Sequence, residues 1–472
     1  MTIEAQKEIA GRFSYLTLNQ IKPRGWILEQ MRGDLADGFA PILDELTIHA
    51  ATDLFKQRID NNSEHMQWWD SETRGNWLLG YVHMAYLADD PLHKQRIDEL
   101  VQALMATQDD DGYIGIYTPD SRYNHAPGEN GELWSQGRAL LILLSYYELT
   151  GDQSALRAAE RSAQLTITQY GPGRPYFVVE GTENGFSLGG LLHGLTYVDA
   201  MEWLYTLTGD VTYRDFGVWL YDDFCQLPGK FTHDDMKLSL LLDADEALRG
   251  HAAHPAEHLR TVIYSYFMTG RPELKQGIDN AFAKLARYIV PSGALIGDES
   301  IHGLPYPEMG YEYCTMFELM NSISNAAQKF GRVEYGDWIE NITFNAAQGA
   351  RFTDGKAICY LSAENRLRAL DVMPDTYSNH RYQFDPTLKE IWQGNPHQDW
   401  QRGGRFKFSP THEDVAVCCN PNAVRLMPHY TSKLWLRVND SSDLVAFMYG
   451  PSLLETVVNG VPVAIVQDTH YP

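Results

Sequence analysis

The sequence predicts a mainly α protein, an (α/α)6 barrel followed by the start of a β-sandwich. Two observations predict it: a helix–turn–helix phrase recurs about every sixty residues, and strand-like segments take over after about residue 432. We therefore expect a barrel at residues 1–432 and a strand-rich segment at 433–472, which reads as an incomplete β-sandwich.

The repeat is marked by short turns that follow apolar helical runs. The turns lie at Asp89, Gly151, Gly209, Gly270 and Gly331, so the successive spacings are 62, 58, 61 and 61 residues. Glycine after the last helical residue is the usual left-handed cap, and Asp or Pro then opens the next helix. Each turn therefore joins two helices, and five such pairs follow one another along the chain.

The two helices of a pair differ in character. Helices before the turns are apolar on all sides, as at 138–149, whereas those after the turns are amphipathic, as at 155–170. A helix that is apolar all round belongs inside, and an amphipathic one belongs outside. Further helices predicted at 25–35 and 422–430 bring the total to twelve, enough for two rings of six. An open α-solenoid is the alternative, and the large loops between the pairs favour the barrel.

The last forty residues have the hydrophobic pattern of β-strands. The segments KLWLRV, DLVAFMY, TVVNG and VPVAIV alternate or run apolar at strand length. Asn459-Gly460 is a strong signal for a tight hairpin turn. The strands are few and short, so we expect the β-sandwich to continue beyond this sequence.

Composition excludes several classes of function. The chain has 472 residues, is 44% hydrophobic, and carries 38 Lys and Arg against 62 Asp and Glu, a net charge of -24. Such a surplus of negative charge argues against binding to nucleic acid or to anionic membranes. No secretory signal or membrane-spanning run is evident, and five cysteines do not make a disulfide framework. We expect a cytoplasmic protein.

Three cysteines and one glutamate form a candidate metal site. Glu312 and Cys314 open the inner helix of the fifth pair, and Cys418-Cys419 precedes the last helix. A vicinal pair hardly forms its own disulfide but can present two thiolates to one metal, and such soft donors select zinc. The alternative is that these are buried, inert cysteines, which is how we interpret Cys225 and Cys359.

Three motifs make a family resemblance specific. GDES at 297–300, GYEYC at 310–314 and CCNPN at 418–422 are similar, in this order, to the signature stretches of glycoside hydrolase family 127, the β-L-arabinofuranosidases. The segments IKPRGWILEQMRGDLADGF, GHAAHPAEHLRTVIYSYFMTG and YGPSLLETVVNGVPVAI also resemble that family. The resemblance therefore extends over nearly the whole chain.

The resemblance implies a role for each motif residue. Zinc would be bound by Glu312, Cys314, Cys418 and Cys419, with Cys418 as the nucleophile of a retaining glycosidase. Glu299 would be the general acid/base, although Asp298 and Glu308 lie in the same loop. His251 matches a histidine that contacts substrate. A closed four-ligand zinc is more often structural, and the sequence leaves that alternative open.

Residues near the starts of inner helices are candidates for binding the sugar. His193 and His251 precede inner helices at equivalent repeat positions, and Trp134 is placed to stack on a sugar or to pack in the core. Arg138 stands where the family has a histidine. An arginine in the pocket would suit an acidic sugar, so the identity of the substrate stays open.

The sequence thus predicts an enzyme that acts on a carbohydrate. The expected reaction is release of a terminal β-L-arabinofuranose or similar furanosidic sugar with retention. The alternatives are a hydrolase of another, acidic plant-polysaccharide sugar and a non-catalytic sugar-binding protein with a structural zinc. A zinc-free hydrolase or isomerase on the same barrel is a third. The oligomeric state is open, with a homodimer among the alternatives.

Overall fold

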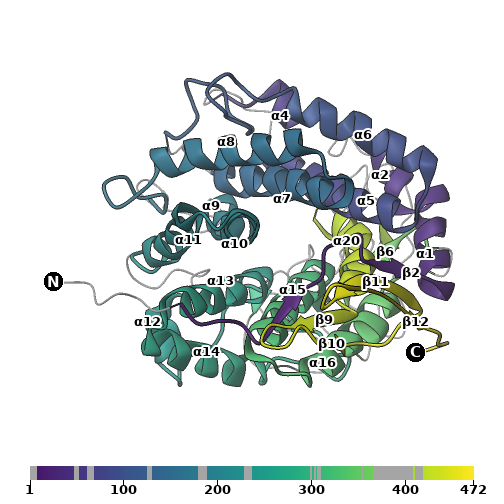
Figure 1. The fold of residues 1–472 in the computed structure, drawn as a ribbon. Coiled ribbons are helices and arrows are strands. Elements are labelled where there is room, and N and C mark those ends of the chain that lie inside the picture. The colour runs from purple at the N-terminus through teal and green to yellow at the C-terminus, as the bar shows by residue number, and fades with distance from the viewer. Residues whose placement is uncertain are drawn as a thin grey trace, which may run out of the picture.

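The computed structural model describes most of the chain. The described residues are 8–46, 53–60, 68–124, 130–178, 189–227, 236–297, 300–301, 305, 310–352, 355–364, 408–409 and 418–472. Within them, helices form the body of the molecule and the strands form small sheets (Figure 1). The predicted fold class is therefore confirmed.

Six helices form a closed inner ring. In chain order each contacts the next, and the last returns to the first, so that α20 lies between α5 and α15 (Figure 1). Most of these inner helices are buried on nearly all sides, which is why they read as apolar throughout, whereas the second half of α10 is more exposed. The inner ring consists of α5 (Trp69–Leu87), α7 (Glu132–Thr150), α10 (Tyr197–Thr208), α13 (Ala253–Thr269), α15 (Tyr313–Phe330) and α20 (Cys419–Ser432).

The outer ring covers the inner one pair by pair. Each of the first five inner helices packs against the helix that follows it, and α20 packs against two helices from the start of the chain. The outer helices are α6 (Pro91–Met105), α8 (Gln153–Gln169), α11 (Val211–Phe224), α14 (Pro272–Leu285), α16 (Tyr335–Asn341) with the π-helix η3 (Ile342–Ala347), and α1 (Gly25–Ala36) with α2 (Phe39–Leu46). Short helical segments in the connections are α4 (Leu54–Gln57), α9 (Gly189–His193), the 3-10 turn η2 (Gly194–Thr196) and α12 (Leu238–Leu242).

The predicted caps account for the turns within the pairs. Gly151 ends α7 with a φ of 79°, and the other three turn glycines also lie in the left-handed region. The side chain of Asp152 then accepts a hydrogen bond from the Ser154 amide, at 2.8 Å, which caps the start of α8. The first turn differs, because Asp89 itself adopts a φ of 54°.

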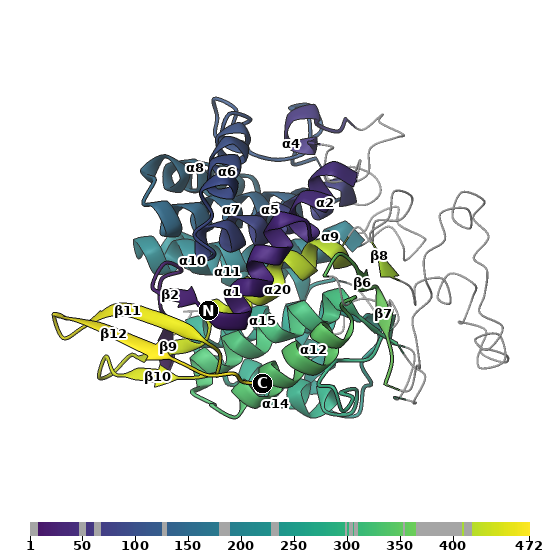
Figure 2. The same ribbon diagram turned by 90° about the vertical axis from the view of Figure 1, so that its right-hand side faces the viewer.

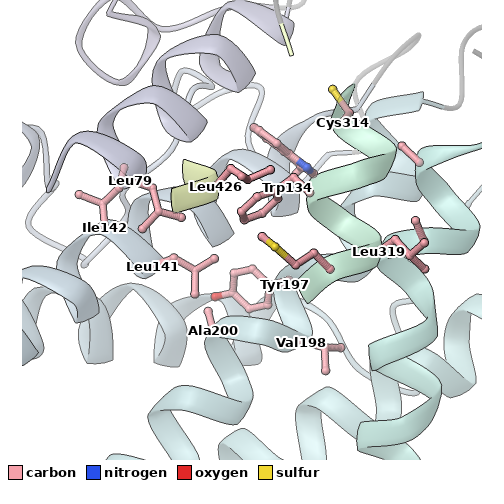
Figure 3. Close-up of a cluster of buried hydrophobic side chains, with 14 of the residues drawn as sticks. Leu79, Trp134, Leu141, Ile142, Tyr197, Val198, Ala200, Cys314, Leu319 and Leu426 are labelled. Atoms are coloured by element: carbon pink, nitrogen blue, oxygen red, sulfur yellow. The ribbon is translucent and has the colours of Figure 1, made fainter. Parts of the chain in front are cut away.

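The core of the barrel is built where the inner helices face one another. Figure 3 shows Leu79, Leu141, Tyr197 and Leu319, which come from four of these helices, gathered in one apolar cluster. All four are at most 7% exposed. This packing fixes the relative positions of the helices, whose starts carry the candidate site.

Two three-stranded sheets lie on one side of the helical body (Figure 2). One sheet has the order β1-β9-β10 and the other β12-β11-β2, with all neighbours antiparallel. The predicted turn at Asn459-Gly460 joins β11 to β12, and both residues have positive φ. The strands are β1 (Phe13–Tyr15), β2 (Ile21–Pro23), β9 (Trp435–Val438), β10 (Leu444–Ala446), β11 (Ser452–Val458) and β12 (Val461–Gln467).

The pairing of these sheets was not predicted. The sequence analysis placed the strand-rich segment at 433–472 alone, but each sheet takes one strand from the first 23 residues. Strands of this segment therefore pair with strands from the start of the chain as well as with one another. Its membership of a larger β-sandwich, and with it the division at residue 432, stays a prediction.

Short two-stranded ladders lie near the starts of the inner helices. They pair β3 (Gly250–His251) with β4 (Ser300–Ile301), β5 (Tyr311–Glu312) with β7 (Leu361–Ser362), and β6 (Ile358–Cys359) with β8 (Phe408–Ser409). The first ladder contains His251 and the second contains Glu312, so the ladders fix the positions of these two candidate site residues at the end of the barrel.

Candidate functional site

The structure brings together the four side chains of the predicted metal site. Glu312 ends β5 immediately before α15, Cys314 lies in the first turn of α15, and the Cys418-Cys419 pair begins α20. Since α15 and α20 are neighbours in the inner ring and start at the same end, two segments more than a hundred residues apart meet there. We call these four residues the Cys–Glu cluster.

The distances within the Cys–Glu cluster fit a tetrahedral zinc. Sulfur atoms bound to one tetrahedral zinc at about 2.3 Å lie about 3.8 Å apart. The Sγ atoms of Cys418 and Cys419 are 3.8 Å apart, and Glu312 Oε1 lies 3.6 Å from each. Cys314 Sγ is closer to Cys419 Sγ, at 3.1 Å. The donor set of three thiols and one carboxylate therefore suits zinc in chemistry, and in spacing everywhere except between Cys314 and Cys419, which zinc would move apart.

The three thiols of the cluster differ in exposure and in electrostatics. Cys419 is 0% and Cys314 4% exposed, whereas Cys418 is half-buried. Burial raises the pKa of Cys314 and of Cys419. Hydrogen bonds from these two thiols hold the pKa of Cys418 well below its usual range, and Tyr360, whose hydroxyl lies 3.7 Å away, adds to the effect. Of the three thiols, the most accessible one is thus the one that most readily loses its proton.

A layer of histidines adjoins the cluster. His251 Nδ1 lies 4.0 Å from Glu312 Oε2, and the His251 ring is 5.8 Å from that of His193 and 5.1 Å from that of His254. The two predicted histidines therefore lie together beside the predicted metal site. His254 was not singled out from the sequence.

A buried ion pair holds His193 in place. His193 Nδ1 lies 2.6 Å from Glu257 Oε1, and His258 Nε2 lies 3.3 Å from the same oxygen. Burial alone would lower the pKa of His193, but the charge and hydrogen bond of Glu257 raise it to about 9. His193, His254 and Glu257 also present ligand atoms within 4.8 Å of one another. The raised pKa means that His193 carries its proton, and so a positive charge, at neutral pH.

Trp134 and Arg138 occupy the first turns of α7. Trp134 is the third residue of the helix, near its start as predicted, and is 2% exposed. Its ring contacts Trp68 at 5.8 Å and His193 at 6.3 Å, while the Arg138 guanidinium stacks over it at 4.7 Å. Arg138 is 1% exposed and, among the described residues, forms no ion pair. Both side chains are thus almost wholly buried in the wall of the site.

Glu72 is a site residue that sequence reasoning missed. It lies in the first turn of α5 and is half-buried. Burial and then the charge of Cys418 raise the pKa of Glu72 to about 8, and His193 and Arg138 act in the opposite direction. This carboxyl therefore shares its electrostatic surroundings with three of the predicted site residues, Cys418, His193 and Arg138. Its position one turn after the Trp68-Trp69 pair, on the face that points into the barrel, was the available signal.

Not every predicted residue can be placed. Glu299 lies outside the described residues, as do Asp298, Glu308 and the segment 365–407. The described chain resumes at Ser300, which pairs with His251 in the β3–β4 ladder. Cys225 and Cys359 lie apart from the cluster, with Cys359 Sγ 2.8 Å from the Leu361 carbonyl and Cys225 Sγ accepting from the Leu238 amide.

Comparisons of sequence point to one family. The family model described as "β-L-arabinofuranosidase, GH127 catalytic domain" matches residues 40–239. A non-reducing end β-L-arabinofuranosidase of Bifidobacterium longum subsp. longum is 22% identical over 360 residues, which are 68% of this chain and 51% of that protein. The chain thus spans about half the length of this relative. In the described part of the chain, no helix has the length and apolar character needed to cross a membrane.

Comparisons of structure show the same fold. A GH127 β-arabinofuranosidase superposes with a TM-score of 0.71 at 17% identity, over 98% of this chain and 68% of that one. A GH127 β-L-arabinofuranosidase from Geobacillus stearothermophilus T6 gives a TM-score of 0.67 at 17% identity, over 96% of this chain and 71% of that one. In its motifs, in residues 40–239 and in its fold, the chain therefore resembles the β-L-arabinofuranosidases of glycoside hydrolase family 127.

Proposed function

We propose that the protein is a retaining glycoside hydrolase that releases a terminal β-L-arabinofuranose or a similar furanosidic sugar. The match of residues 40–239 to the GH127 catalytic domain supports the reaction class. The observation that carries the proposal is the state of Cys418. Its sulfur belongs to the buried Cys–Glu cluster, is favoured as the thiolate, and is still accessible, which are the properties of a nucleophile.

The reaction runs through two displacements at the anomeric carbon. In the first, Cys418 Sγ forms a bond to that carbon, the glycosidic C–O bond breaks, and Glu299 gives its proton to the leaving oxygen. In the second, Glu299 takes a proton from water, the water oxygen attacks the same carbon, and the C–S bond breaks to return the Cys418 thiolate. The role of Glu299 rests on the GDES motif alone.

Zinc fits the Cys–Glu cluster, and when bound it keeps the coordinated thiols deprotonated near neutral pH. Glu312, Cys314 and Cys419 would hold it together with Cys418. These three are buried, so they are suited to ligation but not to contact with a sugar. Cys418, the half-buried member, is the one whose sulfur can both coordinate and reach the substrate.

The layer beside the cluster is suited to binding sugar hydroxyls. His193 is held as a cation by Glu257 and can donate from its other nitrogen, and His251 lies between His193 and Glu312. Trp134 and Trp68 are buried at the same rim, where they pack behind His193. We assign the two histidines to contact with substrate and the two tryptophans to the aromatic wall that positions them.

A second candidate substrate is an acidic furanoside. Arg138 is buried, stacks on Trp134 and forms no ion pair among the described residues, although it lies near enough to Glu318 and Glu72 to lower the pKa of each. A carboxylate on the sugar would give Arg138 a direct ion pair. Under this alternative, Arg138→Met lowers kcat/KM for the acidic sugar much more than for arabinofuranoside.

We also propose that the protein acts on a soluble carbohydrate in the cytoplasm. The five cysteines are all free, which suits a reducing compartment. The net charge of -24 disfavours nucleic acid and anionic membranes as partners. A homodimer is the assembly we would look for first, by measuring the mass in solution.

The decisive experiment is hydrolysis of an aryl β-L-arabinofuranoside by the intact protein and by Cys418→Ser and Glu299→Gln. We expect turnover by the intact protein and a loss of at least about a hundredfold in both variants. Cys225→Ser is the matched control, because that thiol lies apart from the cluster, and it should keep full activity.

The leaving group separates the two roles. An activated aryl leaving group needs little protonation, so Glu299→Gln should slow the second displacement and leave a burst of released phenol. Cys418→Ser should give no burst. If the protein binds zinc and the sugar but turns over nothing, the structural-zinc alternative replaces the enzyme.

A further inference from the structure

A cavity lies at the end of the barrel away from the Cys–Glu cluster. It has a volume of about 370 Å³, and all six inner helices contribute to its wall together with the segment that joins β1 to β2. Ligand pockets range from about 300 to 1,000 Å³, so this one has room for a small molecule. Nothing in the proposed reaction uses it.

The cavity is separate from the Cys–Glu cluster. His429 lies ten residues after Cys419 on α20, which is about 15 Å along a helix axis. Between them lies a layer of buried ion pairs. Glu318 pairs with Arg260 and with Arg425, at N–O distances of 2.8 Å and 3.1 Å. A molecule in the cavity would therefore not contact the Cys418 sulfur.

Most of the wall is apolar. Leu79 and Leu141, which face each other across neighbouring helices in Figure 3, line the cavity, as do Trp203 and Phe317. A body with few polar atoms, aliphatic or aromatic, would bury its surface here at the usual gain for apolar contact. A sugar, with a hydroxyl on nearly every carbon, would not.

One part of the wall is basic and lacks an anion. Lys433, His429 and His83 all line the cavity. Lys433 forms no ion pair among the described residues, and its ammonium lies 3.3 Å from the centre of the Tyr15 ring. His429 Nε2 is buried without a hydrogen-bond partner. Lys433 and His429 thus border one apolar space with hydrogen-bonding capacity that the described residues do not fill, whereas His83 Nε2 is hydrogen-bonded to Ser145 Oγ, at 2.8 Å.

The acidic residues of the wall do not meet this demand. Glu202 is engaged by Lys329 and by Asn325 Nδ2, and Glu148 accepts from the Trp203 indole, at 2.7 Å, and from a backbone amide. Burial lowers the pKa of Lys433 to about 8 even though Glu148 and Glu202 act in the opposite direction. The basic group would therefore gain from a further negative charge.

We propose that this cavity binds a small organic carboxylate with an apolar or aromatic body, whose carboxylate pairs with Lys433 and His429. The carboxylate oxygens accept hydrogen bonds from Lys433 Nζ and from His429 Nε2, and the body fills the space between Leu79, Leu141 and Trp203. The inference does not rest on the proposed hydrolase activity, because no residue of the Cys–Glu cluster takes part.

Calorimetric titration of the intact protein tests this proposal with three probes. Benzoate carries both features, benzamide keeps the ring without the charge, and inorganic phosphate keeps a charge without the ring. We expect saturable binding of benzoate, and binding of benzamide and phosphate that is weaker by at least about tenfold. Equal binding of benzamide, equal binding of phosphate, or no binding of benzoate overturns the proposal.

Two variants locate the binding. Lys433→Met removes the charge but keeps the length of the side chain, and His429→Gln removes the imidazole. Each should weaken benzoate by at least about tenfold and leave benzamide unchanged. Lys275→Met is the matched control, because Lys275 pairs with Asp279 on the surface of α14. If both cavity variants bind benzoate as the intact protein does, the carboxylate sits elsewhere and the inference is wrong.

Discussion

The imidazole of His193 and the carboxylate of Glu257 form a buried ion pair, with Nδ1 and Oε1 2.6 Å apart. It ties the end of α9 to the first turns of α13 at the rim that carries the Cys–Glu cluster. Each side chain is at most 10% exposed. Burial opposes both charges, so the pair persists only because the two groups neutralise each other.

The stability of the protein should depend on this pair in a defined range of pH. His193 has a raised pKa of about 9, so its contribution is fully present below its ordinary pKa of 6.5 and is lost as the pH rises through about 9. Glu257 has a lowered pKa, so its contribution is present above its ordinary 4.5 and is lost as the pH falls. The pair therefore stabilises most between about pH 4.5 and 6.5.

We expect Glu257→Gln to lower the free energy of unfolding by about 3–5 kcal/mol at pH 5.5, because it leaves a buried imidazole without its anion. At pH 9.5, where His193 is mostly neutral in the intact protein, the loss should be clearly smaller. Chemical denaturation at the two pH values measures both. Glu455→Gln, which removes a surface partner of Lys22, is the control. An equal loss at both pH values would show that the pair is not charged.

Glu72 should act as a neutral carboxyl at neutral pH. Its pKa of about 8 arises from burial and from the nearby Cys418 charge, so it is mostly protonated at pH 7. We therefore expect Glu72→Gln, which is neutral and of similar shape, to keep kcat/KM at pH 7 within about threefold. Above pH 8 the intact protein should lose activity as Glu72 ionises, and the variant should lose less.

The pH profile of kcat/KM on an aryl arabinofuranoside distinguishes this role from a catalytic one. A carboxyl that donates a proton in the reaction contributes about a hundredfold or more. A loss of that size in Glu72→Gln at pH 7 would therefore mean that Glu72, and not only Glu299, transfers a proton.

The repeat made the barrel predictable, because each cap leaves a local mark. Gly151 and its three counterparts adopt the left-handed conformation that glycine signals, and Asp152 caps the helix that follows. The first strands left no such mark. Phe13–Tyr15 and Ile21–Pro23 are three residues each, too short for a period, and they are strands only because Trp435–Val438 and Ser452–Val458 pair with them.

The candidate site was predictable only in part, for a similar reason. The Cys–Glu cluster was found because three thiols and their motifs are distinctive in the sequence. His254 and Glu257 lie on an inner helix that is buried on every side, so no change of polarity separates a site residue from a core residue there. Which partner neutralises a buried charge depends on a contact between two helices, and the sequence of either helix alone does not predict that contact.

Metal content should depend on the buried thiol of α15. Cys314→Ser removes a soft ligand that is 4% exposed, and we expect the purified protein to lose most of its zinc. Elemental analysis with titration of free thiols measures this without any assay of activity. Cys359→Ser, which changes a buried thiol outside the cluster, should keep the metal. If Cys314→Ser retains zinc at the same ratio, the Cys–Glu cluster is not the site that binds it.

The approach of α5 to α20 should be the most sensitive packing contact near the site. A Cβ added at Gly80 would lie 2.7 Å from the backbone of Val424 and Arg425, and backbone atoms cannot turn aside as a flexible side chain does. Gly80→Ala must therefore push α20 away from α5, and α20 carries Cys418 and Cys419. We expect a loss of about 1–3 kcal/mol in the free energy of unfolding and weaker retention of zinc.

Gly33→Ala is the matched control for Gly80→Ala. Gly33 lies in α1 with nothing within 4 Å of an added Cβ, so the substitution only replaces glycine by a better helix former. It should stabilise the protein by about 0.5–1 kcal/mol and leave zinc retention unchanged. Thermal unfolding of the two variants, with and without a chelator, measures the opposite signs. If Gly80→Ala is as stable as Gly33→Ala, α5 and α20 are farther apart than the structure places them. The described geometry of the Cys–Glu cluster, which depends on the position of α20, would then be wrong as well.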